Sequence, residues 1–280
     1  MAKKYLAAAI QLDSQEDKKE NLKAVSAFID EAAARNAKLI ALPEMMNYFG
    51  REEGELEAAE PIGGETTQLL CAKAKQYGVW IHGGSICEKV EGEKRIANTT
   101  VLVNPKGEVA ATYRKLHLFD VTVSSGPSYK ESNVILPGNE IVTAETDLGC
   151  FGMSICYDIR FPEMYRIMVL QGAQVIFTPA AFTLFTGRDH WEPILRTRAI
   201  ECGTYLIAPN QVGKKTTFQT QGKSMIIDPW GNVIAQASDF PGVITAEIDL
   251  DYINAVRAQV PSIANRRAEV YKKHADTLLG

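Results

Sequence analysis

The sequence predicts an α/β protein, a four-layer αββα sandwich, from two features of its pattern. Short apolar segments that suit buried strands alternate with segments of helical period, which is typical of a parallel sheet covered by helices. Two hairpins with similar turns each follow two such strand–helix units. Because each predicted sheet has helices on one face only, the two sheets must bury their other faces against each other.

Apolar runs and helical spacing define the elements of the first half. In chain order we expect a strand at 5–11, a helix at 18–35, a strand in AKLIALPEM that stops at Pro43, a helix at 65–77 and a strand in VWIHGGSIC. The segment NTTVLVNPKGEVAATYRK then predicts a hairpin with its turn at residues 104–107. A polar loop rich in Gly, Pro and Ser is expected over about 119–138.

The second half repeats this scheme. In chain order we expect a strand in GCFGMSIC, a helix at 161–171, a strand in AQVIFTPA, a helix at 188–201, a strand in TYLIAPN and a hairpin in SMIIDPWGNVIAQ. The turns at 104–107 and 228–231 carry Pro and Gly at the same offsets. We therefore interpret residues 1–280 as a single domain with two similar halves, about 3–115 and 147–248, and a polar tail, 249–280. The alternative is that the two hairpins share only their turn chemistry.

The composition is that of an ordinary soluble globular protein, because 46% of the 280 residues are hydrophobic, 23% are charged and the formal net charge is -4. No Lys/Arg run reaches five residues, and no apolar stretch approaches the roughly 18 residues of a membrane span. Neither nucleic acid nor a membrane is therefore an expected partner. The N-terminal apolar run is short and lacks a cleavage pattern, so it predicts a strand rather than a signal peptide.

Five cysteines are present: Cys71, Cys87, Cys150, Cys156 and Cys202. Their odd number, irregular spacing and lack of a CxxC pair argue against a disulfide framework or a zinc site. They indicate a reducing compartment, so we expect a cytoplasmic protein. Most cysteines in such a chain are buried as small apolar residues, and the sequence assigns no role to the four other than Cys156.

Three ionisable residues follow predicted strands, at the carboxyl ends where function gathers in open α/β sheets. Glu44 follows the strand of AKLIALPEM, Lys115 follows the first hairpin and Cys156 ends GCFGMSIC. Singly, each has a structural explanation: a turn cap, a solvated strand end and a core residue. Together they supply a base, a cation and a nucleophile, since the ammonium favours a thiolate and the carboxylate can move its proton to a leaving amine. The ammonium can also stabilise charge that develops when an amide or nitrile is attacked.

Other reaction centres fit the sequence less well. A serine hydrolase elbow, G-x-S-x-G, is lacking. The four histidines form no metal-binding spacing, and the proximity of His117 to Asp120 indicates a metal only weakly. The segment PIGGET lacks the Gly-Lys-Ser/Thr ending of a phosphate loop. We therefore expect neither a metal nor a cofactor.

At these positions the sequence resembles the nitrilase superfamily, also called the carbon–nitrogen hydrolases. The motifs are LPEMM around Glu44, YRKLHLFD around Lys115 and SICYDIRFPE around Cys156, and the resemblance extends from about residue 4 to 271. It implies the same αββα sandwich, often built into dimers that place helix on helix. It also implies a second catalytic glutamate after the lysine, and the candidate is Glu131 in YKESN; the loop composition alone would make Glu131 a solvated charge.

Within this superfamily the chain looks most like amidases that act on deaminated glutathione, through segments such as ESNVILPG, CYDIRFPE and DPWGNV. The related omega-amidases, which act on alpha-ketoglutaramate, share CYD-x-RF. The resemblance implies an amidase for a small linear, carboxylate-bearing amide, working as a homo-oligomer, a dimer or a multiple of dimers. The segment NYFGREEGELEAAEP differs between subgroups and is expected to shape the entrance.

The implied mechanism passes through a thioester on Cys156, with Lys115 and the N–H of Tyr157 stabilising the oxyanion and ammonia or an amine leaving. Phe182 and Thr183 are expected wall residues. Arg160 either holds a substrate carboxylate or braces the loop of Asp158. Three alternatives remain: a nitrilase acting on small nitriles, an N-carbamoyl amide hydrolase, and a non-catalytic binding protein, against which the intact trio argues.

Overall fold

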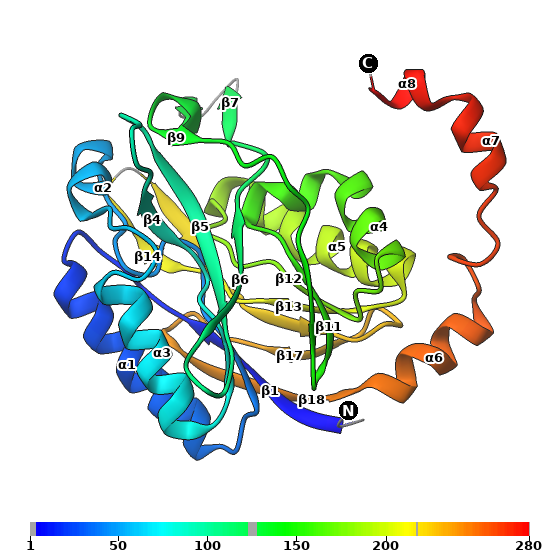
Figure 1. Ribbon diagram of the computed structural model, residues 1–280, viewed down its shortest axis with the longest axis horizontal. Coiled ribbons are helices and arrows are strands. Elements are labelled where there is room, and N and C mark those ends of the chain that lie inside the picture. Colours follow the sequence, from blue (N-terminus) through cyan, green and yellow to red (C-terminus); the bar gives the residue numbers. More distant parts are fainter. Residues whose placement is uncertain (1–3, 123–127, 217, 280) are drawn as a thin grey trace.

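The computed structural model describes residues 4–122, 128–216 and 218–279 of the chain. Two large sheets pack face to face, and helices cover their outer faces (Figure 1). The expected four-layer αββα sandwich is therefore confirmed.

The strands of the first large sheet come mainly from the N-terminal half of the chain. They are β1 (Lys4–Gln11), β2 (Leu39–Ala41), β3 (Trp80–His82), β4 (Ile86–Lys89), β5 (Ile96–Val103), β6 (Val109–Arg114), β9 (Ile135–Leu136) and β18 (Gly242–Asp249). Their order is β18-β1-β2-β3-β5-β4, and both β6 and β9 pair with β5. The helices α1 (Lys18–Ala34) and α3 (Glu65–Tyr77) pack on the outer face (Figure 1).

The second large sheet follows the same plan. Its strands are β10 (Thr143–Thr146), β11 (Gly149–Met153), β12 (Val175–Phe177), β13 (Tyr205–Ala208), β16 (Met225–Ile227) and β17 (Val233–Gln236), hydrogen-bonded in that order. The strands β11, β12 and β13 are parallel, and β16 and β17 form the hairpin. The helices α4 (Pro162–Leu170) and α5 (Leu184–Cys202) cover the outer face (Figure 1).

The remaining elements are short and lie around these layers. They are α2 (Glu52–Ala58), the pair β7 (Asp120–Thr122) and β8 (Ser128–Lys130), the 3₁₀ helices η1 (Glu131–Asn133) and η2 (Cys156–Arg160), the pair β14 (Val212–Lys214) and β15 (Gln219–Gln221), and the C-terminal helices α6 (Leu250–Gln259), α7 (Ala268–Lys273) and α8 (Ala275–Leu279). The last two helices project away from the sandwich (Figure 1). Within the described ranges, no helix has the length and apolarity needed to cross a membrane.

The alternation of side chains along β1 shows how the layers are packed. Ala7 and Ala9 belong to the core between the sheets, where Phe151 and Phe177 lie on the opposite strands. Ala8 and Ile10 belong to the core under α1 and α3. Because successive side chains of a strand point to opposite faces, the apolar residues 5–10 of β1 can fill both cores at once.

Two expectations about strands need correction. The segment VWIHGGSIC was expected to be one strand, but it is two, β3 and β4, separated at Gly83 and Gly84. Gly84 has a φ of +63°, and a Cβ there would lie 2.0 Å from the carbonyl oxygen of Pro43, so the chain must turn here and only glycine fits. The expected loop at 119–138 contains β7, β8, η1 and β9, while its residues 123–127 lie outside the described residues.

Candidate active site

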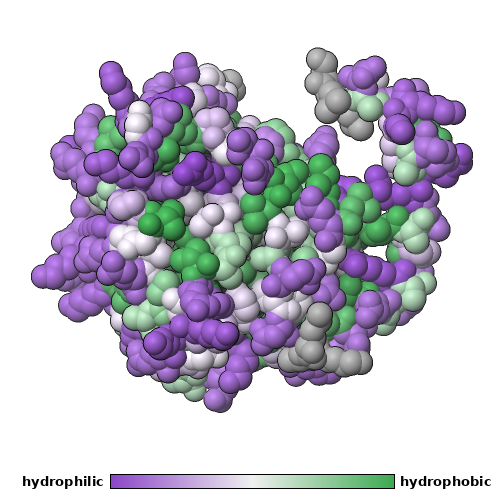
Figure 2. Space-filling model, viewed as in Figure 1, coloured by the Kyte–Doolittle hydropathy of each residue, from purple (hydrophilic) through white to green (hydrophobic). Residues whose placement is uncertain are grey.

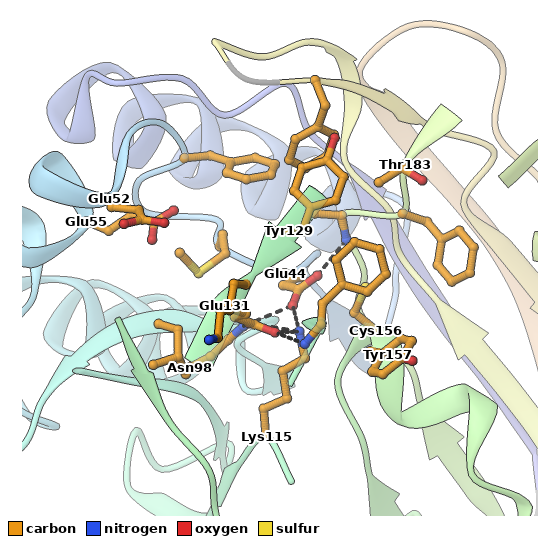
Figure 3. Close-up of a pocket in the computed structure, with 18 of the residues that line it drawn as sticks. Glu44, Glu52, Glu55, Asn98, Lys115, Tyr129, Glu131, Cys156, Tyr157 and Thr183 are labelled. Carbon is orange, nitrogen blue, oxygen red and sulfur yellow. Dashed lines mark hydrogen bonds and ion pairs between the residues drawn. The ribbon is translucent and has the colours of Figure 1, made fainter. Parts of the chain in front are cut away.

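The carboxyl ends of β2, β6 and β11 lead Glu44, Lys115 and Cys156 into one cavity of about 340 Å³ (Figure 3). All three residues are buried, with exposed fractions of 4%, 2% and 9%. Glu131, at the start of η1, lines the same cavity. The structure thus brings all four expected catalytic residues together.

Lys115 lies at the centre of this group. Its Nζ is 2.9 Å from Glu44 Oε1, and 3.0 and 2.9 Å from the two carboxylate oxygens of Glu131. Burial alone would lower the pKa of Lys115, but the charges of Glu131 and then Glu44 outweigh it and hold the pKa well above its usual range. Lys115 therefore carries its positive charge at neutral pH, which suits an electrostatic group and not a base.

Glu131 is held in the cavity by its surroundings. Its Oε2 accepts a hydrogen bond from the backbone N–H of Phe119 at 2.6 Å, in addition to the ion pair with Lys115. The Nδ2 of Asn98 donates to Glu44 Oε1 at 2.9 Å and lies 3.4 Å from Glu131 Oε1. Asn98 is a residue that the sequence did not indicate, because it lies in the middle of the apolar strand β5.

Glu44 also lies in the same cavity as the nucleophile. Its Oε2 accepts a hydrogen bond from the N–H of Ala181 at 2.7 Å, and Cys156 lines the cavity beside it. Burial raises the pKa of Cys156 well above its usual range, the charge of Glu44 raises it further, and Lys115 only partly counteracts them. The cysteine therefore keeps its proton at rest, next to the carboxylate that can accept it during attack.

The backbone around the two reacting groups adopts an unusual conformation. Cys156 has a φ of +48°, and Met45, directly after Glu44, has a φ of +54°. The left-handed region costs a residue other than glycine about 1–3 kcal/mol, so the surroundings must enforce it. The N–H of Cys156 donates to Pro179 O at 2.8 Å, and that of Met45 donates to Ser85 Oγ at 2.9 Å. Both turns are thereby fixed before any substrate binds.

A belt of aromatic rings forms much of the wall. Phe49, Phe218, Tyr129, Phe119 and Tyr157 all line the cavity, and each ring contacts the next with centroids 5.1–5.5 Å apart. Such contacts between rings are typical of a rigid apolar surface. The belt therefore gives this part of the cavity a rigid, apolar wall.

The structure places the expected substrate-binding residues differently. Tyr157, Phe182 and Thr183 line the cavity, whereas Arg160 is not among its lining residues. The guanidinium of Arg160 lies over the rings of Tyr157 and Phe182, with its carbon 6.0 and 5.3 Å from their centroids. Arg160 also does not appear among the partners of the Asp158 carboxylate, which are Tyr113, His117 and Ile155.

The entrance carries charges of both signs. Glu52 and Glu55 of α2 are among the lining residues (Figure 3). Lys130 of β8 also lines the cavity and is exposed. Burial and the nearby carboxylates of Glu131, Glu52 and Glu44 raise the pKa of Glu55 to about 8. Glu55 is therefore mostly protonated at neutral pH, which reduces the negative charge at the entrance. In the part of the chain that the structure describes, no group of three His, Cys, Asp or Glu side chains could hold a metal ion.

Comparisons with known proteins agree with this geometry. The model of the family described as Carbon-nitrogen hydrolase matches residues 6–258. A protein of Synechocystis sp. named deaminated glutathione amidase is 44% identical over 94% of this chain and 98% of its own length. The human omega-amidase NIT2 is 36% identical over 94% of this chain and 95% of its own. The crystal structure of the C. elegans NitFhit protein superimposes with a TM-score of 0.90 at 33% identity, covering 96% of this chain and 66% of that one.

Proposed function

This chain belongs to the carbon–nitrogen hydrolase family, and we propose that it is an amidase that cleaves small, linear, carboxylate-bearing amides of the deaminated glutathione or alpha-ketoglutaramate type. The observation that supports this proposal best is that Cys156, Glu44 and the buried ammonium of Lys115 line one cavity, with Lys115 Nζ 2.9 Å from Glu44 Oε1. A nucleophile, its base and a cation for the oxyanion are thereby within reach of one substrate.

The first half of the reaction forms a thioester. Glu44 accepts the thiol proton as the sulfur of Cys156 attacks the amide carbon, and the carbonyl oxygen becomes an oxyanion. Lys115 Nζ and the N–H of Tyr157 stabilise this charge, since ordered donors in a water-poor site are most effective there. Glu44 then returns its proton to the nitrogen, the carbon–nitrogen bond breaks, and ammonia or an amine leaves.

The second half reverses the proton transfers. Glu44 removes a proton from a water molecule, which attacks the thioester carbon through a second oxyanion. The carbon–sulfur bond breaks, the proton returns to sulfur, and a carboxylic acid is released. Glu131 and Asn98 keep Glu44 and Lys115 in place throughout, because both contact the Glu44–Lys115 pair. The cycle uses only water and the groups of this chain.

Lys130 is the side chain best placed for the distal carboxylate of the substrate. Among the residues that the structure describes, the basic side chains that line the cavity are Lys115 and Lys130, and Lys115 is engaged by two glutamates. Lys130 is exposed to solvent. Because Glu55 is mostly protonated at neutral pH, its carboxyl group repels an anionic substrate only weakly. We assign the carboxylate to Lys130 in preference to Arg160.

The test is a screen for ammonia release. Deaminated glutathione, alpha-ketoglutaramate, asparagine, N-carbamoyl compounds, neutral aliphatic amides and small nitriles would be compared at equal concentration. We expect the highest kcat/KM for the two amides that carry a carboxylate. A nitrile or N-carbamoyl compound as the best substrate, or equal rates on charged and neutral amides, would overturn the proposed specificity.

Two variants separate Lys130 from Arg160. Lys130→Gln should raise KM about tenfold for a carboxylate-bearing amide, because one charge-assisted hydrogen bond is lost, and should leave the KM of a neutral amide unchanged. Arg160→Gln is the matched control, with an expected KM change of less than twofold. A raised KM in Arg160→Gln together with an unchanged KM in Lys130→Gln would instead assign the substrate carboxylate to Arg160.

We also propose that residues 1–280 form one hydrolase domain of two similar halves, and that it is a cytoplasmic homodimer. Ile167 and Leu170 of α4 and Ile200 of α5 are large apolar side chains exposed on the outer layer. Figure 2 shows apolar surface on the side of the molecule where α4 lies. Helix-on-helix packing of two copies would cover this face. Analytical ultracentrifugation should give a dimer that Leu170→Glu dissociates, whereas a monomeric wild-type protein would exclude it.

A further inference from the structure

Asp158 lies two residues after Cys156, and its buried carboxylate is the meeting point of two segments of the site. One oxygen accepts from Ile155 N at 2.9 Å and from Tyr113 Oη at 2.6 Å. The other accepts from His117 N at 3.0 Å and lies 2.7 Å from His117 Nδ1. These four contacts use the full capacity of a carboxylate. We infer that Asp158 is a positioning residue, which fixes the Lys115 segment relative to the turn of Cys156.

On one side, Asp158 holds the turn of the nucleophile. Its carboxylate binds the N–H of the residue before Cys156, while its own N–H donates to Ile155 O at 3.1 Å. Cys156 is thus enclosed in a small ring of hydrogen bonds at the point where its backbone takes the left-handed conformation. Without the carboxylate, the N–H of Ile155 would lose its acceptor and the turn could relax.

On the other side, Asp158 holds the segment that carries the cation. Lys115 stands between Tyr113 and His117, and both contact Asp158. The Tyr113 hydroxyl donates to Asp158 and accepts from Leu116 N at 3.1 Å, so it transmits the contact to the residue next to Lys115. Burial, and then the charge of Asp158, keep the pKa of Tyr113 far above neutrality, so the hydroxyl remains a donor.

The ring of His117 completes the link. It stacks on Phe161, directly after η2, with centroids 3.6 Å apart and an angle of 8° between the planes. The same residue therefore contacts η2 through its ring, its Nδ1 and its backbone. These contacts join the strand end of the first sheet to the strand end of the second, at the position where Lys115 and Cys156 must face one substrate.

The inference rests on the proposed function, and its test has one readout that requires no substrate. Asp158→Asn keeps the size of the side chain but replaces one acceptor oxygen with a donor, which must then face an N–H or a hydroxyl. We expect kcat to fall at least about tenfold with KM within about twofold, because a small displacement of reacting groups lowers the rate without removing binding contacts. In Asp158→Asn, the rate at which iodoacetamide alkylates Cys156 and the pH dependence of that rate should both differ from those of the wild-type protein.

Asp228→Asn is the matched control. Asp228 is also a buried aspartate that accepts from backbone N–H groups, those of Trp230 and Asn232, but it lies in the β16–β17 turn and does not line the cavity. This variant should lower the melting temperature and keep wild-type kcat and alkylation. If Asp158→Asn behaves in the same way, the contacts are structural only and the inference is wrong.

A second variant covers the case in which Asp158→Asn does not fold. Tyr113→Phe removes one hydrogen bond to the carboxylate and leaves the others in place. It should lower kcat about threefold to tenfold at unchanged KM; wild-type kcat and alkylation would overturn the inference. If the wild-type chain releases no ammonia from any amide, the proposed function fails, while the alkylation rates still decide whether Asp158 positions Cys156.

Discussion

Six strands of the first sheet, β18-β1-β2-β3-β5-β6, pair in the same order and directions as the six strands of the second, yet their strand ends carry different residues. Glu44 is three residues after β2, and the matching position after β12 is Ala180. Lys115 directly follows β6, and Ala237 directly follows β17. Cys156 is three residues after β11, where the first sheet has Ser14 after β1.

The different residues at matching strand ends show that two sheets of similar topology can contribute different groups to one site. In the proposed mechanism, the first sheet supplies the base and the cation, and the second supplies the nucleophile, while each matching position carries a small residue. The three groups meet because both sheets direct these strand ends into the same cavity. The backbone plan therefore sets where chemistry can occur, and a few side chains decide which sheet performs which step.

The largest effect is expected at the nucleophile of the second sheet. Cys156→Ser introduces the residue type that the first sheet has at the matching position, Ser14. It should lower kcat at least about 10³-fold, because a hydroxyl is a far weaker nucleophile in this environment. Cys156→Ala should abolish turnover. Both variants should keep the wild-type circular dichroism spectrum and melting temperature. Turnover above a trace in Cys156→Ala would show that another residue attacks the substrate.

The first sheet should respond differently, in stability as well as in activity. Lys115→Met leaves Glu44 and Glu131 buried without their shared cation, so the free energy of unfolding should fall by about 3–5 kcal/mol and turnover should be lost. Urea denaturation measures the first effect. Lys215→Met is a control, since Lys215 is a buried lysine paired with Asp13 and is not used in the reaction. An unchanged free energy of unfolding in Lys115→Met would show that the ion pairs of Lys115 with Glu44 and Glu131 do not stabilise the fold.

A smaller effect is expected at Glu131, which lies in η1, between β6 and β9 of the first sheet. Glu131→Gln removes one charge beside Lys115 and weakens a hydrogen bond, so kcat should fall at least about tenfold while the melting temperature changes little. Glu88→Gln is the control, because Glu88 of β4 also pairs with a basic residue, Arg114 of β6, but does not line the cavity. Wild-type kinetics in Glu131→Gln would reduce the site to three catalytic residues.

The smallest effect concerns the contact between the sheets, where His82 of the first stacks on Phe177 of the second at 4.2 Å. Burial lowers the pKa of His82 to about 3, so the folded protein keeps it neutral while the unfolded chain binds a proton below about pH 6.5. Stability is therefore lost as the pH falls from about 6.5 towards 3, by about 2 kcal/mol at pH 5. Urea denaturation of His82→Gln at pH 7 and 5 should show a smaller loss than the wild type. Equal losses would mean that other groups set the acid sensitivity.

The sequence predicted the parts of the site that follow from local pattern. Glu44, Lys115 and Cys156 each follow an apolar strand, so their meeting at strand ends could be expected. Glu131 was indicated by the family resemblance and not by its polar loop. The alternation of elements was also sufficient for the four layers.

The parts of the site and fold that the sequence did not predict depend on contacts between residues far apart in the chain. Asn98 binds Glu44 across 54 positions, and Asp158 binds His117 across 41, so no local pattern reveals either pair. The helix α2 buries none of its side chains fully and therefore lacks an apolar period. The break at Gly84 arises from its close approach to Pro43, which is a property of the folded chain alone.

The ladder between β1 and β18 joins Lys4–Gln11 to Gly242–Asp249 in eight residue pairs. The first strand of the chain thus depends on one of its last for its outer hydrogen bonds. At a synthesis rate of about 5–20 residues per second, β1 waits roughly 12–50 seconds on the ribosome before its partner exists. During that interval it presents an apolar, unpaired edge, which is the kind of surface that promotes association between chains. The complete first sheet consequently cannot form until β18 has been translated, which happens after all the residues that line the cavity have left the ribosome's decoding site.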